Sequence, residues 1–335
     1  MKNYKLTIGI DVSKAKLDVT FMYDPLSKQH IHFIVSNDAK GIRQIIRELK
    51  KNKTELNDCL FCCENTGIYS MPLSFYLNEL AVDYWVVPAI EIKRSKGISR
   101  GKNDKIDSKD IAFYAISHLH KLILTKLPEK EILRLKVLFT EREKLVKVIK
   151  LLNTTQENET FFPKAILKDV LLTNSKTVKA LEKSLKEIEN KMNEVIRENK
   201  TLSTQYDLSC SVPGVGPQTA TYLLIVTKSF TAFNNWRKLA CYSGIAPFEY
   251  TSGSSIKGRT KVNNLADKKM KSMLNMCALN SKRSDAELCL YYKRKTEEGK
   301  NPMLVMNALR CKVLSRVFAT IKRGTPYINI KKYVA

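Results

Sequence analysis

The run LTIGIDV at residues 6–12 is apolar except for one acid near its end. Such a run is apolar enough for a buried β-strand. Asp11 directly follows Ile8, Gly9 and Ile10, and a carboxylate embedded in an apolar strand is costly unless it is paired or binds a cation. The run therefore predicts a buried strand that carries a candidate functional acid.

Strands and helices are predicted to alternate around this run up to about residue 125. The further predicted strands are Leu17–Met22, Ile31–Val35, Leu60–Cys63 and Tyr84–Val87. The predicted helices are one capped by Asn37 or Asp38 and running through Lys50, one near Leu73–Leu80, and Asp104–Leu119. Three strands followed by helix–strand–helix–strand–helix predict a mixed sheet with helices on its faces.

Two apolar stripes with an alternating spacing of three and four residues come next. The first runs from Leu135 to Leu152 with Arg142 as its one polar member, and the second from Val178 to Leu202 with Asn199 as its exception. This spacing is typical of a coiled-coil seam. Because residues 161–163 read FFP, they must break a continuous helix. We expect a long helical hairpin whose stripes pack together or against another copy; the alternative is two ordinary amphipathic helices on a core.

The chain is strongly basic. It has 335 residues, with 58 Lys and Arg against 33 Asp and Glu, a formal net charge of +25. Residues 255–335 hold 19 Lys and Arg against 5 Asp and Glu, a net charge of +14. A compact protein this basic needs an anionic partner, and nucleic acid is favoured over an anionic membrane surface.

Composition also bears on location. No apolar stretch approaches the roughly 20 residues of a transmembrane helix, so no membrane span is expected. The eight cysteines are scattered through a long chain rather than forming a dense framework, which predicts reduced thiols in a cytoplasmic protein.

Three more acids stand where they can join Asp11. Glu64 follows the predicted strand Leu60–Cys63, and Asp104 and Asp107 project to one face at the start of a helix. The ends of the first and fourth strands of a mixed sheet can lie side by side with a helix N-terminus nearby. Converging carboxylates need a hard cation, and Mg²⁺ suits them, with Mn²⁺ as the alternative. Two such ions about 3.5–4 Å apart can clamp both oxygens of a phosphodiester displacement.

A structural explanation stays open for these three acids. Asp104 and Asp107 also suit a helix N-terminus through its macrodipole, and Glu64 suits the cap of a turn. A basic stretch beside the last two acids favours a site that cuts phosphodiesters, because acids alone would repel DNA; a solvated basic loop is the alternative. The stretch comprises Lys93, Arg94, Lys96, Arg100, Lys102 and Lys105.

Two motifs in the C-terminal half suit phosphate. In VPGVGP at residues 212–217, Gly214 and Gly216 let backbone N–H groups approach a phosphate before a helix that starts near Gln218; a simple tight turn explains the motif equally well. TSGSS at residues 251–255 is a hydroxyl cluster followed by Lys257 and Arg259. A serine that attacks phosphorus needs such cations nearby, although the residues alone favour a flexible loop that contacts phosphates.

Taken together, these motifs resemble one family along nearly the whole chain, the DEDD transposases of the one-ten family of bacterial insertion sequences, which are bridge-RNA-guided recombinases. The resemblance is carried, in order, by IGIDVSKAKLDV, CCENTG, GKNDKIDSKDI, SVPGVGPQTA, YSGIAPFEYTSGSSIKGR and the basic tail. It implies a RuvC-like domain of RNase H fold at residues 1–125 and a coiled-coil region at 126–205. A mostly helical transposase domain with a helix-hairpin-helix-like element is implied at 206–335.

The resemblance also implies residues and partners. Its catalytic, metal-binding tetrad falls on Asp11, Glu64, Asp104 and Asp107, and its serine nucleophile falls on Ser252, with Ser254 and Ser255 as alternatives. It implies cutting and rejoining of donor and target DNA duplexes guided by a structured non-coding RNA. It further implies a homo-oligomer, a dimer or a tetramer, in which the RuvC-like domain of one protomer meets the serine domain of another.

Two other functions stay open at this point. A RuvC-like nuclease would hydrolyse DNA junctions with water and would need only the four acids. A non-catalytic nucleic-acid-binding protein would use the acids as caps and the charge for binding. The first does not need the helical and serine-bearing remainder, and the second does not need an acid in an apolar strand.

Overall fold

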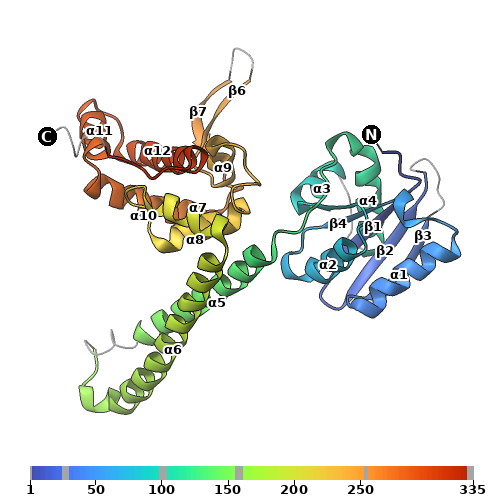
Figure 1. The fold of residues 1–335 in the computed structure, drawn as a ribbon, viewed down its shortest axis with the longest axis horizontal. Helices are drawn as coiled ribbons and strands as arrows, with labels where there is room; N and C mark the ends of the chain where they lie inside the picture. The colour runs from blue at the N-terminus through green and yellow to red at the C-terminus, as the bar shows by residue number, and fades with distance from the viewer. Residues whose placement is uncertain (1, 25–29, 98–103, 155–160, 253–255, 330–335) are drawn as a thin grey trace. The chain divides into compact units, whose positions relative to one another are not determined.

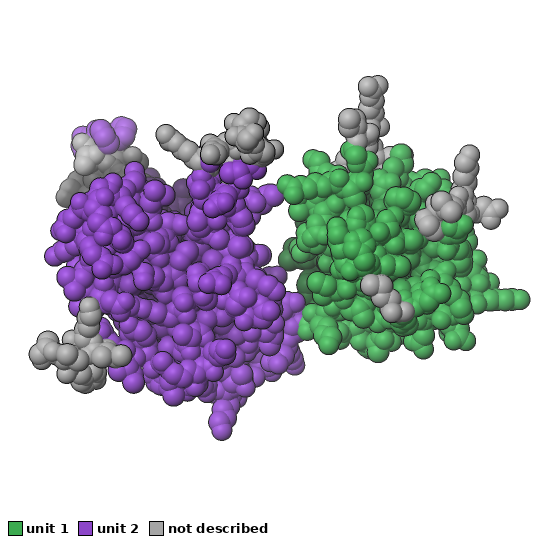
Figure 2. Space-filling model, turned by 90° about the horizontal axis from the view of Figure 1, so that it is seen from above, with its two compact units in different colours: residues 1–127 green, residues 128–335 purple. Residues whose placement is uncertain are grey.

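The computed structural model divides the chain into two compact units, residues 1–127 and residues 128–335 (Figure 2). It describes residues 2–24, 30–97, 104–154, 161–252 and 256–329. No helix in these ranges is long and apolar enough to cross a membrane, and the eight cysteines are all free thiols.

The N-terminal unit is built on a five-stranded sheet (Figure 1). Its strands are β1 (Leu6–Val12), β2 (Lys16–Met22), β3 (Ile31–Ser36), β4 (Cys59–Glu64) and β5 (Tyr84–Val87). Its helices are α1 (Ala39–Lys51), α2 (Met71–Glu79), α3 (Ala89–Ser95) and α4 (Asp104–Ser117), with short 3₁₀ turns η1 (Leu56–Asp58), η2 (Gly67–Ser70) and η3 (Leu119–Lys121). Every strand and helix predicted in this region is confirmed; α3 was not predicted.

The strand order is β3-β2-β1-β4-β5, with β1 and β2 antiparallel, β2 and β3 antiparallel, and β4 parallel to both β1 and β5. A three-stranded meander continued by two parallel strands is the arrangement of the RNase H fold. The mixed sheet and the RuvC-like fold class are therefore confirmed.

Helices cover both faces of this sheet. On one face, Ile8 and Ile10 of β1 pack with Ile42 and Ile45 of α1 and with Leu73 of α2. On the other face, residues of β4 and β5 pack with α3 and α4; this cluster is Leu60, Cys62, Trp85, Val87, Ile92, Ile111, Tyr114 and Ala115. Since successive strand residues point to opposite faces, Gly9 and Asp11 point toward α4.

Gly9 allows α4 to lie directly on β1. A Cβ atom at this position would overlap the carbonyl oxygen of Ser108 and the amide nitrogen of Ala112, both in α4. The Thr20 hydroxyl, on the strand next to β1, is 2.7 Å from the Ser108 hydroxyl in a buried hydrogen bond. This contact fixes where the first turn of α4 lies against the end of β1.

The C-terminal unit begins with a helical hairpin. Helix α5 (Lys130–Asn153) and helix α6 (Lys164–Glu198) lie side by side and run in opposite directions (Figure 1). At the base of the hairpin, Leu135 packs with Met192 and Val195. Arg142, the polar member of the first stripe, donates from Nε to Glu189 Oε1 across the hairpin at 2.7 Å. The predicted hairpin is confirmed, whereas its coiled-coil character stays a prediction.

The second stripe is not one helix. Helix α6 ends at Glu198, and Asn199 adopts an extended backbone whose side chain accepts a hydrogen bond from the Leu202 amide at 3.1 Å. A new helix, α7 (Lys200–Cys210), starts there. The stripe does reach Leu202, which packs in the same core as Met192 and Val195. The helix that carries the stripe is interrupted because Asn199 acts as an N-cap, the role that short polar side chains favour over a helix interior.

The rest of the unit is mostly helical, as predicted, with one β-hairpin that was not predicted. The helices are α8 (Pro217–Thr227), α9 (Trp236–Tyr242), α10 (Lys268–Ser284), α11 (Ala286–Glu297) and α12 (Pro302–Arg323). The antiparallel strands β6 (Pro247–Ser252) and β7 (Ile256–Val262) form the β-hairpin. The core of the C-terminal unit is formed by residues of α8, α10 and α12, among them Leu223, Leu274 and Leu309.

Replacing Gly9 with Ala should separate α4 from β1. The new methyl group would clash with backbone atoms of α4, so we expect the free energy of unfolding to fall by about 2 kcal/mol or more. Hydrogen–deuterium exchange should accelerate in β1 and α4. Gly67→Ala is the control, because Gly67 has φ +71 but nothing within 4 Å of its Cβ position. It should cost about 1 kcal/mol through backbone strain and leave exchange in α4 unchanged. Equal exchange in α4 for both variants would contradict this packing.

Candidate active site

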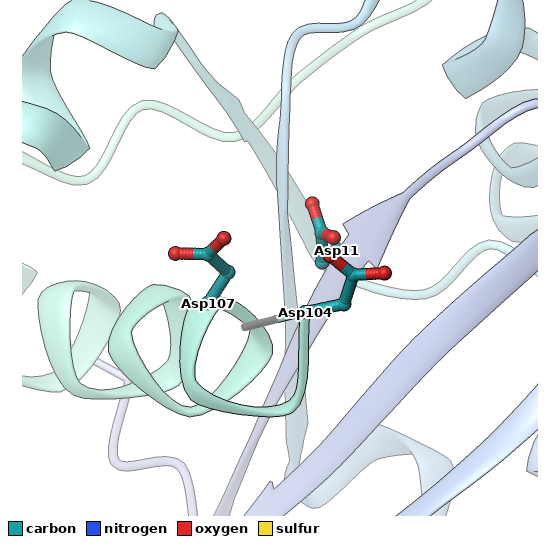
Figure 3. A group of neighbouring side chains, drawn as sticks. All are labelled: Asp11, Asp104 and Asp107. Atoms are coloured by element: carbon teal, nitrogen blue, oxygen red, sulfur yellow. The ribbon is translucent and has the colours of Figure 1, made fainter. Parts of the chain in front are cut away.

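Three of the four predicted acids meet near the end of β1, the central strand of the N-terminal sheet (Figure 3). Asp11 lies near the end of β1, and Asp104 and Asp107 occupy the first turn of α4. One carboxylate oxygen from each residue lies within 4.8 Å of the others. The residues come from segments more than 90 positions apart in the sequence, so the fold and not chain proximity brings them together.

Glu64 lies on the strand next to Asp11. Strands β1 and β4 are parallel, and Ile10 pairs with Cys63, which places Asp11 and Glu64 one position further along adjacent strands. The negative charge of Glu64 acts on Asp11. Its carboxylate is nevertheless outside the group of three whose oxygens lie within 4.8 Å. The structure thus places Glu64 at the same end of the neighbouring strand, although its carboxylate is not part of the tight cluster.

Burial and repulsion keep Asp11 unusually easy to protonate. Burial and then, in order, the charges of Asp107, Asp104, Glu64 and Asp18 together raise the pKa of Asp11 to about 6. Both causes disfavour the carboxylate form, and both would be relieved by a cation bound between the acids. The sequence predicted that a carboxylate in this strand would be unfavourable without a partner, and the raised pKa of Asp11 agrees with that prediction.

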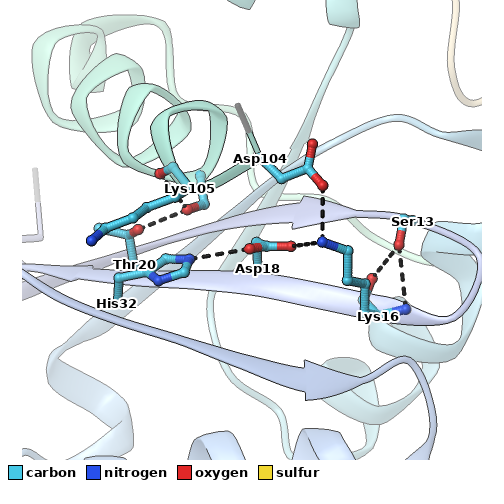
Figure 4. A network of polar contacts seen from close by, with 8 residues as sticks. Ser13, Lys16, Asp18, Thr20, His32, Asp104 and Lys105 are labelled. Carbon is cyan, nitrogen blue, oxygen red and sulfur yellow. Dashed lines mark hydrogen bonds and ion pairs between the residues drawn. The ribbon is translucent and has the colours of Figure 1, made fainter. Parts of the chain in front are cut away.

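Two lysines already bring positive charge to this cluster. Lys16 Nζ lies 2.9 Å from Asp104 Oδ2 and 3.1 Å from Asp18 Oδ2 (Figure 4). These contacts, first with Asp104 and then with Asp18, raise the pKa of Lys16. Lys96 Nζ lies 2.5 Å from Asp107 Oδ1. Burial, the largest single influence, lowers the pKa of Lys96, but the hydrogen bonds and charges of Asp107 and Asp110 together outweigh it, so the net effect is an increase.

Asp18 is a buried acid that sequence reasoning missed. It pairs directly with Asp11 across β1 and β2, and it is 3% exposed. Besides Lys16, its partner is His32, whose Nε2 lies 3.2 Å from Asp18 Oδ1 (Figure 4). Lys16 and Asp18 are two positions apart on one strand, so they share the face that carries Asp11. The two-residue spacing of Lys16 and Asp18 is visible in the sequence KLDV at residues 16–19. Only the pairing of β2 with β1 shows that these side chains lie on the same face as Asp11.

The other predicted phosphate contacts of this unit are spread out. Lys93 and Arg94 lie on α3 with exposed side chains, and Lys105 follows Asp104 with an exposed side chain. Lys96, predicted as a nucleic-acid contact, is half-buried and paired with Asp107 and Asp110. Arg100 and Lys102 lie outside the described residues.

In the C-terminal unit, Ser252 is the last residue of β6, and Lys257 and Arg259 lie on β7. Ser252 pairs with Ile256, and Thr251 pairs with Lys257. Ser252 is therefore the last paired residue of β6. The side chains of Ser252, Lys257 and Arg259, and all of Ser254 and Ser255, lie outside the described part of the chain.

The VPGVGP motif makes a tight turn into α8. Gly214 has φ +88, and a Cβ atom there would overlap Ser281 and Cys277 of α10. The Ser281 hydroxyl donates to the Pro213 carbonyl at 2.6 Å. Gly216 precedes α8, with nothing within 4 Å of its Cβ position. Gly214 is thus needed for packing on α10, while Gly216 leaves open space at the start of α8.

Two family models match the chain. Residues 8–157 match the DEDD transposase model of the IS110 group, described as a transposase, and residues 206–293 match the model described as "Transposase IS116/IS110/IS902 family". The chain belongs to the IS110/IS116/IS902 family of transposases. The resemblance found in the sequence is confirmed, and this transposase is an enzyme that acts on DNA.

Relatives of this transposase include two bacterial proteins of nearly the same length. The "Pilin gene-inverting protein" of Moraxella lacunata and that of Moraxella bovis are each 24% identical over 327 residues, covering 96% of this chain and 98% of the relative. The "Insertion element IS110 uncharacterized 43.6 kDa protein" of Streptomyces coelicolor is 32% identical over 117 residues, 35% of this chain and 29% of that protein.

One solved structure also shows a likeness to this transposase. T. thermophilus RuvC in complex with a Holliday junction substrate aligns over 37% of this chain and 100% of its own, with 10% identity and a TM-score of 0.29. The strand order described above, and not this likeness, identifies the fold.

The acidic cluster of the transposase suits a divalent metal ion. Its donors are carboxylate oxygens from three residues, which are the hard ligands that Mg²⁺ and Mn²⁺ prefer. The pKa of Asp11 is raised first by burial and then by the neighbouring acids, and a cation bound between these acids would relieve their repulsion.

Asp11→Asn should stabilise the metal-free protein. Because the folded state raises the pKa of Asp11 to about 6, the protonated acid is favoured on folding, and this stability is lost as the pH rises from about 4 through 6. In EDTA at neutral pH, we expect a higher Tm for Asp11→Asn, by roughly 2–4 °C for each kcal/mol gained. Thermal unfolding monitored by circular dichroism measures this. With excess Mg²⁺ the gain should shrink, and a lower Tm in EDTA would contradict the repulsion.

Proposed function

We propose that this transposase cuts and rejoins DNA through a metal site formed by Asp11, Glu64, Asp104 and Asp107, with Ser252 as a covalent nucleophile. The observation that supports it most is that Asp11, Asp104 and Asp107, from two distant segments, lie within 4.8 Å of one another. A pure binding protein gains nothing from that repulsion. The cluster is therefore best explained by catalysis on phosphodiesters.

Within this proposal, Asp11, Asp104 and Asp107 hold Mg²⁺ directly, and Glu64 completes the set from the neighbouring strand. Bound Mg²⁺ would stabilise the negative charge that develops on phosphate oxygens during displacement. Lys16 and Lys96 hold the carboxylates of Asp104 and Asp107 in place through their ion pairs. The four acids could hold two such ions, which is the number we propose.

The serine step conserves the energy of the broken bond. The Ser252 oxygen would bond to phosphorus while the phosphorus–oxygen bond of the DNA backbone breaks, and the serine proton would end on the leaving oxygen. Reversing these changes with another DNA end would rejoin the strands without ATP. Lys257 and Arg259 on the facing strand β7 are the cations that we expect to offset the charge on the reacting phosphate.

A structured guide RNA is proposed as the second nucleic-acid partner. The family resemblance implies it, and the net charge of +25 suits a protein that grips two kinds of phosphate backbone. The lysine-rich surface suits phosphates and shape more than base edges. In this scheme, base pairing by the RNA would select donor and target DNA, and the protein would supply the chemistry.

A homo-oligomer, a dimer or a tetramer, is proposed as the active form. Far from its base, the α5–α6 hairpin carries several exposed apolar side chains, including Leu151 at 69% exposure, Phe161 at 81% and Ile166 at 67%. Exposed apolar clusters of this kind are typical of protein–protein contacts. Such an assembly would let the acidic site of one protomer serve the serine hairpin of another.

Inversion of a DNA segment is a second candidate outcome of the same chemistry. It is favoured by the match to the two pilin gene-inverting proteins over 96% of this chain. Cutting and rejoining two sites on one DNA molecule inverts the segment between them, whereas two sites on different molecules give insertion. The arrangement of the sites, and not the active site, would decide between these outcomes.

Changing any one of the four acids to its amide should lower the rate of strand cleavage by about 100-fold or more, the loss that is typical when one catalytic group is removed. DNA binding should survive. Removing Mg²⁺ with EDTA should do the same. Gel assays of cleavage and of mobility shift measure both effects. Asp83→Asn is a suitable control, because Asp83 pairs with Lys2 and precedes the start of β5, whereas Glu64 pairs with Val87 at the end of that strand. Wild-type cleavage by Asp11→Asn would show that the site is wrong.

Ser252→Ala should bind DNA and form no covalent protein–DNA adduct. Denaturing gels with end-labelled DNA measure the adduct, and Ser254→Ala and Ser255→Ala are the matched controls. Mixing Ser252→Ala with Asp11→Asn should restore the adduct if two protomers share the work. Normal recombination by Ser252→Ala would exclude this serine. If the triple serine variant still releases free 5′-phosphates, the enzyme is a water-using nuclease.

A further inference from the structure

A buried arginine in the C-terminal unit has no acidic partner among the residues that the structure describes. Arg310 on α12 is 8% exposed. Its Nε and Nη2 donate to Asn275 Oδ1 on α10, at 3.2 and 2.6 Å, and its Nη1 donates to Asn307 Oδ1 at 3.3 Å. All three bonds end on neutral amide oxygens. The guanidinium is held firmly, but its charge is not balanced by these residues.

This is an unusual environment for a guanidinium. Buried charges in proteins are normally paired, because burial removes the water that stabilises them. Burial lowers the pKa of Arg310, and Cys311 acts in the opposite direction. A guanidinium nevertheless stays charged at any physiological pH. The fold therefore maintains a fixed positive charge in a partly desolvated place.

The same helix shows how an arginine is balanced internally. Arg316 Nη1 lies 2.9 Å from Asp285 Oδ2, and its Nη2 lies 2.9 Å from Glu287 Oε2. Asp285 is fully buried, so this pair is part of the fold. Arg310 and Arg316 thus form a natural contrast on α12: one is neutralised by the protein, and the other is bound only to amides.

Arg310 is linked through Asn307 to the segment that precedes the β6–β7 hairpin. Asn307, which orients it, donates from Nδ2 to the Ile245 carbonyl at 2.7 Å, and Ile245 is two residues before β6 begins. Lys271 stands one helical turn before Asn275, on the same face of α10. The guanidinium is therefore connected to the segment just before β6, and the helix that holds it through Asn275 also carries Lys271.

We propose that Arg310, oriented by Asn275 and Asn307, binds a phosphodiester group of the nucleic acid on which the transposase acts. A guanidinium carries five N–H donors, and its three bonds to the two asparagines leave two for a further acceptor. Its planar fork matches two phosphate oxygens. A phosphate would supply the missing negative charge on binding. The proposal rests on the action on DNA and is independent of Ser252 and of a guide RNA.

Asn275→Asp tests the site by supplying the missing charge from within. The new carboxylate would pair with Arg310, so the Tm should rise while affinity for a short fluorescent duplex DNA falls about tenfold. The slope of log K against log salt should become shallower by about 0.9, the value for one lost phosphate contact. Asn280→Asp is the charge-matched control, because Asn280 is an exposed residue of α10. It should leave both the Tm and the slope unchanged.

Arg310→Gln and Arg316→Gln should have opposite effects. The first removes an unbalanced charge, so it should keep the Tm and make the salt slope shallower by about 0.9. The second leaves Asp285 buried without its partner, so it should lower the Tm and keep the slope. If Arg310→Gln fails to fold, Asn275→Asp decides, because it adds an ion pair and removes none.

The same titrations with a labelled RNA hairpin identify the source of the phosphate. A shallower slope with duplex DNA assigns the site to DNA, and a shallower slope with RNA alone assigns it to an RNA backbone. Wild-type slopes for Asn275→Asp and Arg310→Gln with both probes would overturn the proposal and leave Arg310 as a tether between α10 and α12. Loss of cleavage in the Asp11→Asn variant has no bearing on this result.

Discussion

Helix α4 can lie directly on strand β1 because Gly9 has no side chain. The contact is tight enough that backbone atoms of Ser108 and Ala112 occupy the space of a Cβ atom, and the Thr20–Ser108 hydrogen bond holds the second strand to the same helix. The acidic cluster follows from this packing, because the first turn of α4 carries two acids to the strand that carries Asp11. A looser helix would leave three separate carboxylates with no shared ligand position.

The acidic cluster is stabilised by lysines that pair with its two outer acids, Asp104 and Asp107. Lys16 and Lys96 pair with Asp104 and Asp107, while Asp11 keeps a raised pKa. Burial and repulsion together therefore act on Asp11, which lies near the end of the central strand of the sheet. Such an arrangement is poorly stable alone and well suited to a bound cation, which is how enzymes convert folding energy into a preorganised charge site.

The C-terminal unit distributes its positive charge differently. Arg316 is neutralised by acids of the same unit, whereas Arg310 is held by the side-chain amides of Asn275 and Asn307. Internal pairing stabilises the fold, and leaving a guanidinium to neutral partners preserves its charge for another molecule. The net charge of +25 is therefore not one uniform surface property. Some of the cations are paired with acids within the fold, and Arg310 is bonded to amides alone among the described residues.

Local pattern was enough for most of the secondary structure and for the choice of acids. Apolar runs marked all five strands of the sheet, and the cost of Asp11 in such a run marked the site. Local pattern failed where a polar cap competed with an apolar stripe, at Asn199, and where strands formed by pairing alone, in the β6–β7 hairpin. Distances among the acids, the contact of Lys16 with Asp104, and the isolation of Arg310 depended on packing between distant segments. Hydrophobic periodicity is a property of neighbouring residues and can be read from the sequence. The partner of a charged side chain depends on which elements come together when the chain folds.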